Sequence, residues 1–223
     1  KSEKNMKTIA IIGGTGKEGR GLAYRWVKAG HEVVIGSRSL EKAEAAVNEM
    51  NKILPLKFKL QGETNEKAAT QCEIIVITVP YTAHQEILST LQNVISTKLV
   101  IDVTVPIVPP QVTKVHIPHA GSAALEAQEI LGSNCKIASA FHNVSYDLLL
   151  HDNPIECDVL VSGTDDETIQ ATLELVRDAG LKGWDAGPLE NSIVAESLTS
   201  VLIYLNKKYK TQHAGIKITG IKY

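Results

Sequence analysis

The stretch IIGGTGKEGRG, residues 11–21, decides the fold. Its glycines at Gly14, Gly16 and Gly19 stand in the spacing G-x-G-x-x-G. The run TIAII at residues 8–12 is β-branched and typical of a strand buried on both faces, and residues 22–29 have a helical pattern that ends at Gly30. Between a strand and a helix, this spacing predicts a loop that holds the pyrophosphate of a dinucleotide.

Each glycine of the loop has a separate task in such a site. The first permits a tight turn, the second lets the backbone approach the pyrophosphate, and the third lets the helix pack on the strand. The first turn of the helix then offers free N–H groups and a partial positive charge to the phosphates. The expected cofactor-binding residues of this loop are Gly14, Thr15, Gly16, Lys17, Glu18 and Gly19.

Strand-like and helix-like segments alternate along the 223 residues. Strands are expected at residues 8–12, 32–35, 58–60, 74–79, 98–103, 136–141, 158–161 and 181–186, and helices at 22–29, 40–50, 64–70, 83–91, 122–131, 165–179 and 190–206. This order predicts an α/β fold, a Rossmann-type doubly wound, mostly parallel sheet with a small C-terminal α/β extension. A proline-rich connection at 105–118 separates a dinucleotide-binding domain, residues 6–120, from a smaller part, residues 121–223.

Composition narrows the class of protein further. A net charge of −2 and 4% aromatic residues give no support to nucleic-acid binding, and no apolar run reaches the length of a membrane span. The first residues lack the apolar stretch of a secretory signal. Three cysteines without a C-x-x-C pair suit free thiols in the cytoplasm. His116 and His119 are separated by Ile-Pro and have no flanking carboxylate, so no metal site is expected.

The end of the second strand distinguishes NADP from NAD. An NAD-binding fold carries an acidic residue there for the ribose hydroxyls, whereas this chain reads IGSRSLEK at residues 35–42. Ser37, Arg38 and Lys42 supply a hydroxyl, a guanidinium and an ammonium at one point, and Thr15 can add a second hydroxyl. This set suits a 2′-phosphate, to which arginine makes planar contacts. The predicted cofactor is NADP(H).

The ends of two later strands supply the other candidate residues. In doubly wound folds ligands bind beyond the carboxyl ends of the strands, where the strand order reverses. Apolar groups and proline can form a floor for the nicotinamide ring, and imidazole or amide groups can donate hydrogen bonds. The sequence does not decide whether either histidine of this set acts as an acid or a base. The candidates are Val79, Pro80, Tyr81, His84, Phe141, His142 and Asn143.

Several segments together resemble one enzyme family. The runs IIGGTGKEGRGLA, GSRSLEKAEA, TVPYTAH, FHN and DAGPLENSIVAESLT, with a GIK near the C-terminus, resemble the NADPH-dependent coenzyme F420 reductases. The similarity extends over residues 6–218. Its most specific parts are GSR followed by a lysine and the late DAGPL…N…ESLT stretch. The ferric reductase domains of the STEAP proteins share the first motif but are less similar in the C-terminal half.

The resemblance implies direct hydride transfer between NADP(H) and the deazaflavin coenzyme F420, whose rings stack face to face, in a homodimeric enzyme. The cofactors then carry the reaction and the protein supplies alignment and exclusion of water, so no catalytic residue is assigned and His142 is an orienting donor. Tyr81 and Asn143 depart from the family pattern. The implied 2′-phosphate contacts are Thr15, Ser37, Arg38 and Lys42. The implied deazaflavin pocket contains Pro80, Tyr81, His142, Asn143 and residues 215–217.

Other readings of the same fold remain open at this point. An NADPH-dependent flavin or ferric reductase would need the same cofactor loop, and a non-catalytic NADP(H)-binding module would need nothing more. Pyrroline-carboxylate-type and β-hydroxyacid-type reductases carry about 100 further residues of all-helical domain, for which this chain is too short. Measuring the oxidation of NADPH with a defined acceptor distinguishes these alternative functions.

Overall fold

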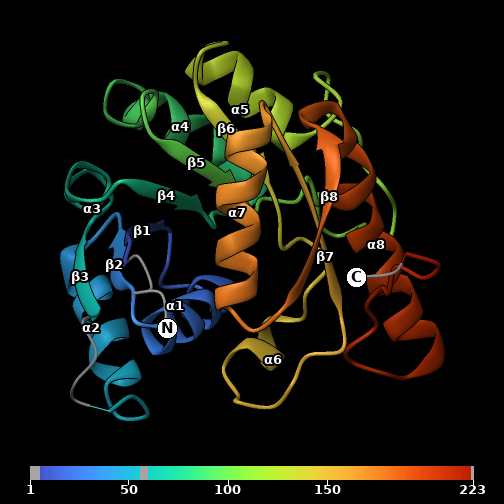
Figure 1. Ribbon diagram of the computed structural model, residues 1–223, viewed down its shortest axis with the longest axis horizontal. Coiled ribbons are helices and arrows are strands. Elements are labelled where there is room, and N and C mark those ends of the chain that lie inside the picture. The colour runs from blue at the N-terminus through green and yellow to red at the C-terminus, as the bar shows by residue number, and fades with distance from the viewer. Residues whose placement is uncertain (1–5, 56–59, 222–223) are drawn as a thin grey trace.

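The computed structural model describes residues 6–55 and 60–221, and its centre is one eight-stranded sheet (Figure 1). The strand order is β3-β2-β1-β4-β5-β6-β7-β8. All neighbours pair in parallel except β6 and β7, which pair antiparallel. The strands are β1 (Thr8–Ile12), β2 (Glu32–Ser37), β3 (Leu60–Thr64), β4 (Ile74–Ile77), β5 (Leu99–Asp102), β6 (Lys136–Ser139), β7 (Asp158–Gly163) and β8 (Lys182–Pro188).

Helices cover both faces of this sheet. One face packs against α1, α2, α6 and α7, and the other against α3, α4 and α5, which gives two apolar clusters. Figure 1 shows α7 lying across one face and α8 beside β8. The helices are α1 (Lys17–Ala29), α2 (Leu40–Met50), α3 (Asn65–Gln71), α4 (Tyr81–Ile95), α5 (Ala123–Leu131), α6 (Tyr146–Leu149), α7 (Asp166–Asp178) and α8 (Ser192–Tyr209), with a 3₁₀ turn at Leu189–Asn191.

Alternation along β1 explains how this sheet forms a core on two sides. Ile9 and Ile11 belong to the cluster under α1, α2 and α7, whereas Ala10 and Ile12 belong to the cluster under α3, α4 and α5. Successive side chains of a strand point to opposite faces, so a continuous apolar run is needed where both faces are buried. The order of the strands reverses between β1 and β4, which makes their carboxyl ends the expected ligand crevice.

The predicted fold class is confirmed, and the differences are local. Helix α1 begins at Lys17 rather than at residue 22, because Gly19 packs against the loop and Gly21 against Leu149, and neither interrupts the helix. The strand expected at 136–141 ends at Ser139, since Phe141 has a φ of 70°, which no strand residue adopts. Helix α6 was not expected. The strand expected at 58–60 lies outside the described residues except for Leu60, where β3 begins. None of the described helices combines the length and apolarity needed to span a membrane.

Candidate cofactor and second-substrate site

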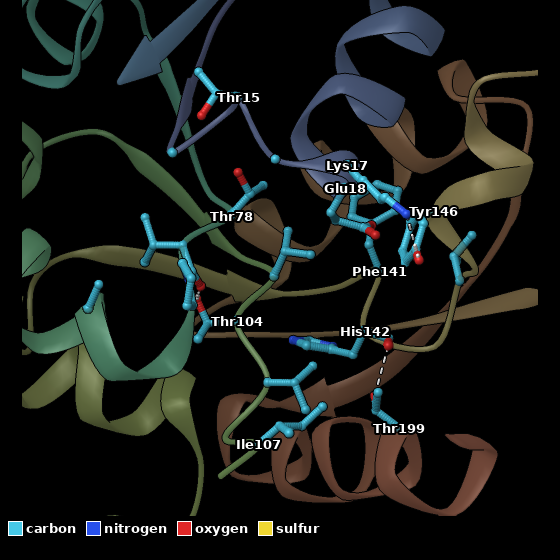
Figure 2. A pocket seen from close by; sticks show the side chains of 18 of the residues that line it. Thr15, Lys17, Glu18, Thr78, Thr104, Ile107, Phe141, His142, Tyr146 and Thr199 are labelled. Atoms are coloured by element: carbon cyan, nitrogen blue, oxygen red, sulfur yellow. Dashed lines mark hydrogen bonds between the residues drawn. The ribbon is translucent and has the colours of Figure 1, made fainter. Parts of the chain in front are cut away.

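A cavity of about 1010 Å³ lies at the carboxyl ends of the central strands. Figure 2 shows the glycine loop and the start of α1 on one side and Thr199 of α8 on the other. Arg38 and Lys42 line one end, and Thr199 and Ala214 line the other. The predicted site residues that line the cavity are Thr15, Gly16, Lys17, Glu18, Ser37, Arg38, Lys42, Val79, Pro80, Phe141, His142 and Asn143.

Gly14 and Gly19 shape the loop from behind and do not line the cavity. The Gly14 N–H donates to the carbonyl oxygens of Ile11 (3.1 Å) and Gly36 (3.0 Å), which ties the turn to β1 and β2. A Cβ on Gly19 would lie 2.6 Å from Gly14 Cα, so only glycine lets α1 approach the loop this closely. Gly16 differs, because a Cβ there would meet only Gly13 O, at 3.8 Å. Its space is left for a ligand, as a pyrophosphate-binding glycine requires.

Two polar side chains brace the loop. Asn65 Oδ1 accepts a hydrogen bond from the Gly13 N–H (3.3 Å), and Arg20 Nε donates to the carbonyl oxygen of Thr15 (2.9 Å). Arg20 is itself paired with Glu49 of α2. The loop is thus held in its extended shape before any ligand arrives, and neither Asn65 nor Arg20 belongs to the glycine motif.

The basic end of the cavity brings the predicted 2′-phosphate contacts together. Ser37 ends β2 and is buried, whereas Arg38 and Lys42 are exposed on the turn into α2 and on its first turn. Thr15 lines the same cavity from the glycine loop. Two exposed cations and two hydroxyl groups around one space can bind a dianion with little reorganisation of the fold.

The middle of the cavity is made by the ends of β4 and β5. Val79 and Pro80 line it as predicted, and Thr78 and Thr104 line it as well (Figure 2). The Thr78 hydroxyl donates to the carbonyl oxygen of Ile12 (3.0 Å), so it joins β4 to β1 across the crevice. Neither threonine was predicted as a site residue, because a lone Thr after a strand is common in any connection.

His142 is buried at the far end and is electrically neutral. Burial lowers the pKa of His142 to about 4, so its imidazole carries no charge at pH 7. Its Nε2 lies 3.4 Å from Ser139 Oγ, and its buried Nδ1 has no hydrogen-bond partner among the residues that the structure describes. Thr199 fixes the backbone here, since its hydroxyl donates to the His142 carbonyl oxygen at 2.7 Å. The unpartnered Nδ1 is the kind of group that a ligand satisfies.

Asn143 lines the cavity, but its side-chain amide makes its hydrogen bonds to other residues of the protein. Its Nδ2 donates to the carbonyl oxygen of Asp158 (2.7 Å) and contacts the sulfur of Cys157 (3.2 Å). Asp158 begins β7 and also holds the C-terminal segment, because its N–H donates to Ile216 O (2.8 Å) and its Oδ2 accepts from the Ile218 N–H (2.8 Å). Asn143 therefore joins the cavity wall to β7 and does not present its donor to a ligand.

The sequence also predicts Tyr81 and His84 in this site, and the structure places neither in the cavity lining. Tyr81 donates to Glu126 Oε1 of α5 (3.1 Å), and burial, with the nearby Glu126, raises the pKa of its phenol to about 12. His84 Nε2 lies 2.6 Å from Asp102 Oδ2 in the interior. Burial alone would lower the pKa of His84, but the charge and hydrogen bond of Asp102 outweigh it and raise that pKa.

The His84–Asp102 pair supports the cavity from behind. The opposite carboxyl oxygen, Asp102 Oδ1, accepts the N–H of Thr104 at 2.9 Å, and Thr104 lines the cavity. Burial opposes ionisation of Asp102, yet His84 and the N–H of Thr104 lower its pKa. His84 thus acts on the site through Asp102 and not by contact with a ligand.

The C-terminal part of the chain contributes residues that the sequence did not single out. Thr199, Leu202, Ile203 and Asn206 form one side of α8 facing the cavity, and their spacing of three to four residues was the available signal. Gln212 and Ala214 follow, whereas residues 215–217 lie outside the lining. Within residues 6–55 and 60–221, no group of three or more His, Cys, Asp or Glu is arranged to bind a metal ion.

Fold and cavity together define an oxidoreductase of the NADP-binding Rossmann class. The family model described as NADP oxidoreductase coenzyme F420-dependent matches residues 8–106. The chain is 36% identical over 222 residues to the F420-dependent NADP reductase of Methanocaldococcus jannaschii, covering 96% of this chain and 99% of that protein. It is 37% identical to the enzyme of that name from Methanothermobacter marburgensis, covering 96% and 98%. This chain belongs to the family of F420-dependent NADP reductases.

Solved structures agree on the fold. A crystal structure from Arthrobacter sp. FB24 superposes with a TM-score of 0.81 at 20% identity, covering 97% of this chain and 100% of that chain. A pyrroline-5-carboxylate reductase from Coxiella burnetii superposes with a TM-score of 0.62 at 15% identity, covering 92% of this chain but 69% of its own. The shared part is thus the Rossmann unit, and that reductase is longer than this chain.

Proposed function

We propose that this chain transfers a hydride between NADP(H) and the deazaflavin coenzyme F420. The observation that carries the proposal is one cavity that continues from the cationic end at Arg38 and Lys42 to the neutral end at His142, in a chain of this family. Direct transfer requires both rings in van der Waals contact inside a single space from which water is excluded. The two cofactors supply the redox chemistry, and the protein needs no acid–base pair for the hydride itself.

NADP(H) occupies the part of the cavity built by residues 6–120 in this proposal. Ser37, Arg38, Lys42 and Thr15 contact the 2′-phosphate, and the N–H groups of the first turn of α1 contact the pyrophosphate. The open space at Gly16 supports this placement, because a side chain would fill it. Val79 and Pro80 then lie where the nicotinamide ring needs an apolar floor.

Residues 121–223 complete the pocket for the second substrate in the same proposal. His142 accepts or donates one hydrogen bond through its unpartnered Nδ1 and adds no charge that would compete with the hydride. Thr199 keeps the His142 backbone in place, and Leu202 and Ile203 of α8 offer apolar surface to the deazaflavin ring. The neutral, buried character of this end suits a planar ring more than a phosphate.

The acceptor decides between this proposal and the flavin or ferric reductase alternative. Purified protein is mixed anaerobically with NADPH and with oxidised F420, FAD, FMN or a ferric chelate, and the absorbance of each acceptor is followed. The proposal expects rapid bleaching with F420 and slow or absent reaction with the others. Fast reduction of flavin or iron without reduction of F420 would contradict it.

We further propose that the protein is a cytoplasmic homodimer. Val194, Val201 and Tyr204 are 62, 43 and 50% exposed on one side of α8, and an apolar strip of this kind suits a two-fold interface. Buried free thiols at the three cysteines suit a reducing compartment. Analytical ultracentrifugation of wild type and Val201→Glu tests the interface, since the variant is expected to sediment as a monomer.

A further inference from the structure

One carboxyl group in the cavity has no role in the placement described above. Glu18 lies in the first turn of α1 and lines the cavity, and its buried Oε1 has no hydrogen-bond partner within residues 6–55 and 60–221. Figure 2 shows Glu18 beside Phe141 and Tyr146. A buried acceptor that no protein group satisfies is costly, so its retention calls for a ligand or a proton.

The charged groups around Glu18 do not neutralise it. Lys17, its neighbour on α1, points to Tyr146 of α6, with Nζ 3.3 Å from the phenol oxygen and 4.7 Å from the ring centre. Asp147 of α6 lines the cavity with the same sign of charge, and His142 is neutral at pH 7. Glu18 has no ion pair within the described part of the chain, and burial raises its pKa to about 8.

An ionised Glu18 would oppose the cofactor. The pyrophosphate of a dinucleotide sits at the start of this helix, and two anions close together in a poorly solvated space repel strongly. A protonated carboxyl removes the repulsion and can donate its O–H to a phosphate oxygen. Because the acceptor is charged, this hydrogen bond is of the stronger, charge-assisted kind.

We propose that NADP(H) binds the form of this protein in which Glu18 is a neutral carboxylic acid that donates a hydrogen bond to the cofactor's diphosphate, so that binding is linked to proton uptake. The proposal rests on the placement of the dinucleotide at the glycine loop. Below about pH 8 the carboxyl of Glu18 already carries this proton in the free protein, so binding of NADP(H) is accompanied by little proton uptake. Above it the free protein is ionised, and the affinity falls by up to tenfold for each pH unit.

Calorimetric titration of the full chain with NADPH tests this directly. Wild type, Glu18→Gln and Glu129→Gln are titrated at pH 7, 8, 9 and 9.5, each in two buffers of different ionisation enthalpy. Glutamine keeps the shape and a hydrogen-bond donor but cannot ionise, whereas Glu129 is an exposed carboxylate of α5 that does not line the cavity and serves as the control. Measurements start at pH 7 because the 2′-phosphate itself titrates near pH 6.

Wild type and Glu129→Gln are expected to lose about tenfold in affinity between pH 7 and pH 9 and to take up close to one proton at pH 9. Glu18→Gln is expected to keep its affinity for NADPH within about twofold over the same pH range and to bind NADPH without taking up this proton. The same pH dependence in Glu18→Gln, or no proton uptake by wild type, would overturn the proposal. If the folded protein does not bind NADPH at pH 7, that result would instead contradict the placement of the cofactor at the glycine loop, and the Glu18 proposal would fail with it.

Discussion

The two ends of the cavity are built by opposite means. The end at Arg38 and Lys42 is exposed and cationic, and these two residues stand with Ser37 within six positions of one another. The end at His142 is buried and neutral, and it is assembled from the segment after β6, from α8 and from the C-terminal segment. Exposed charges can be removed without disturbing the core, whereas the buried end depends on hydrogen bonds that also hold the fold. Substitutions at one end should therefore change affinity, and at the other end stability or turnover.

The largest effect is expected at the support of the buried end. His84→Ala leaves the Asp102 carboxylate buried without its partner, and breaking a buried pair in this way costs about 3–5 kcal/mol in free energy of unfolding. Urea denaturation followed by circular dichroism measures the loss. His119→Ala, which removes an exposed histidine, should leave the unfolding curve unchanged. Equal stability of both variants would show that the pair is not structural.

At the cationic end the expected change is in cofactor affinity alone. Arg38→Ala removes one charge-assisted hydrogen bond, about 1.5–3 kcal/mol, so the KM for NADPH should rise roughly 10- to 100-fold. NADH, which lacks the 2′-phosphate, should be used as before, and urea denaturation should match wild type. Exposed Lys52→Ala outside the cavity is the control. If the KM values for NADPH and NADH rise equally, the 2′-phosphate is not at Arg38.

Alanine substitutions at two glycines of the loop should distinguish an effect on NADPH affinity from an effect on stability. Gly16→Ala has room for its methyl group in the unliganded chain, so stability should hold while NADPH affinity falls about tenfold, or 1.4 kcal/mol. Gly19→Ala places a methyl group 2.6 Å from Gly14 Cα and should lose stability as well as affinity. Thermal unfolding and NADPH titration of both variants measure the contrast. Normal NADPH binding by Gly16→Ala would place the pyrophosphate elsewhere.

The smallest effect is expected at Thr199. Thr199→Val keeps the shape but removes the hydrogen bond to the His142 carbonyl oxygen, worth about 0.5–1.5 kcal/mol. We expect kcat/KM for F420 to fall two- to tenfold, because His142 loses its fixed position, while the KM for NADPH stays constant. Thr199→Ser should restore the activity. A change confined to NADPH would assign α8 to the dinucleotide end.

The cationic end was predictable because its residues belong to one strand, one turn and one helix start. The spacing of the glycines and the sequence GSR followed by Lys42 fix those positions before any long-range contact is known. The buried end was predictable only in part. Phe141 turns the chain with a positive φ, which its residue type does not predict. Tyr146 reaches the cavity because it lies on α6, a helix that was not predicted.

His84 illustrates a different limit of sequence reasoning. Its position just after β4 predicted a place in the site, but its side chain pairs with Asp102 of β5 and does not line the cavity. Asn143 is similar, since its amide is used by Asp158, a residue fifteen positions away. In both cases the position of a polar residue follows from the sequence, whereas a partner from another strand determines which groups its side chain contacts.

Stereospecifically deuterated NADPH tests most directly whether the two ends of the cavity hold two rings in contact. Protein, oxidised F420 and either (4R)- or (4S)-[4-²H]NADPH are mixed anaerobically, and the F420H2 formed is analysed by mass spectrometry and NMR. Direct transfer predicts that one of the two labelled forms moves its deuterium quantitatively to C5 of the deazaflavin and the other moves none. Deuterium lost to water, or transferred from both forms, would contradict direct transfer between two rings held in one cavity.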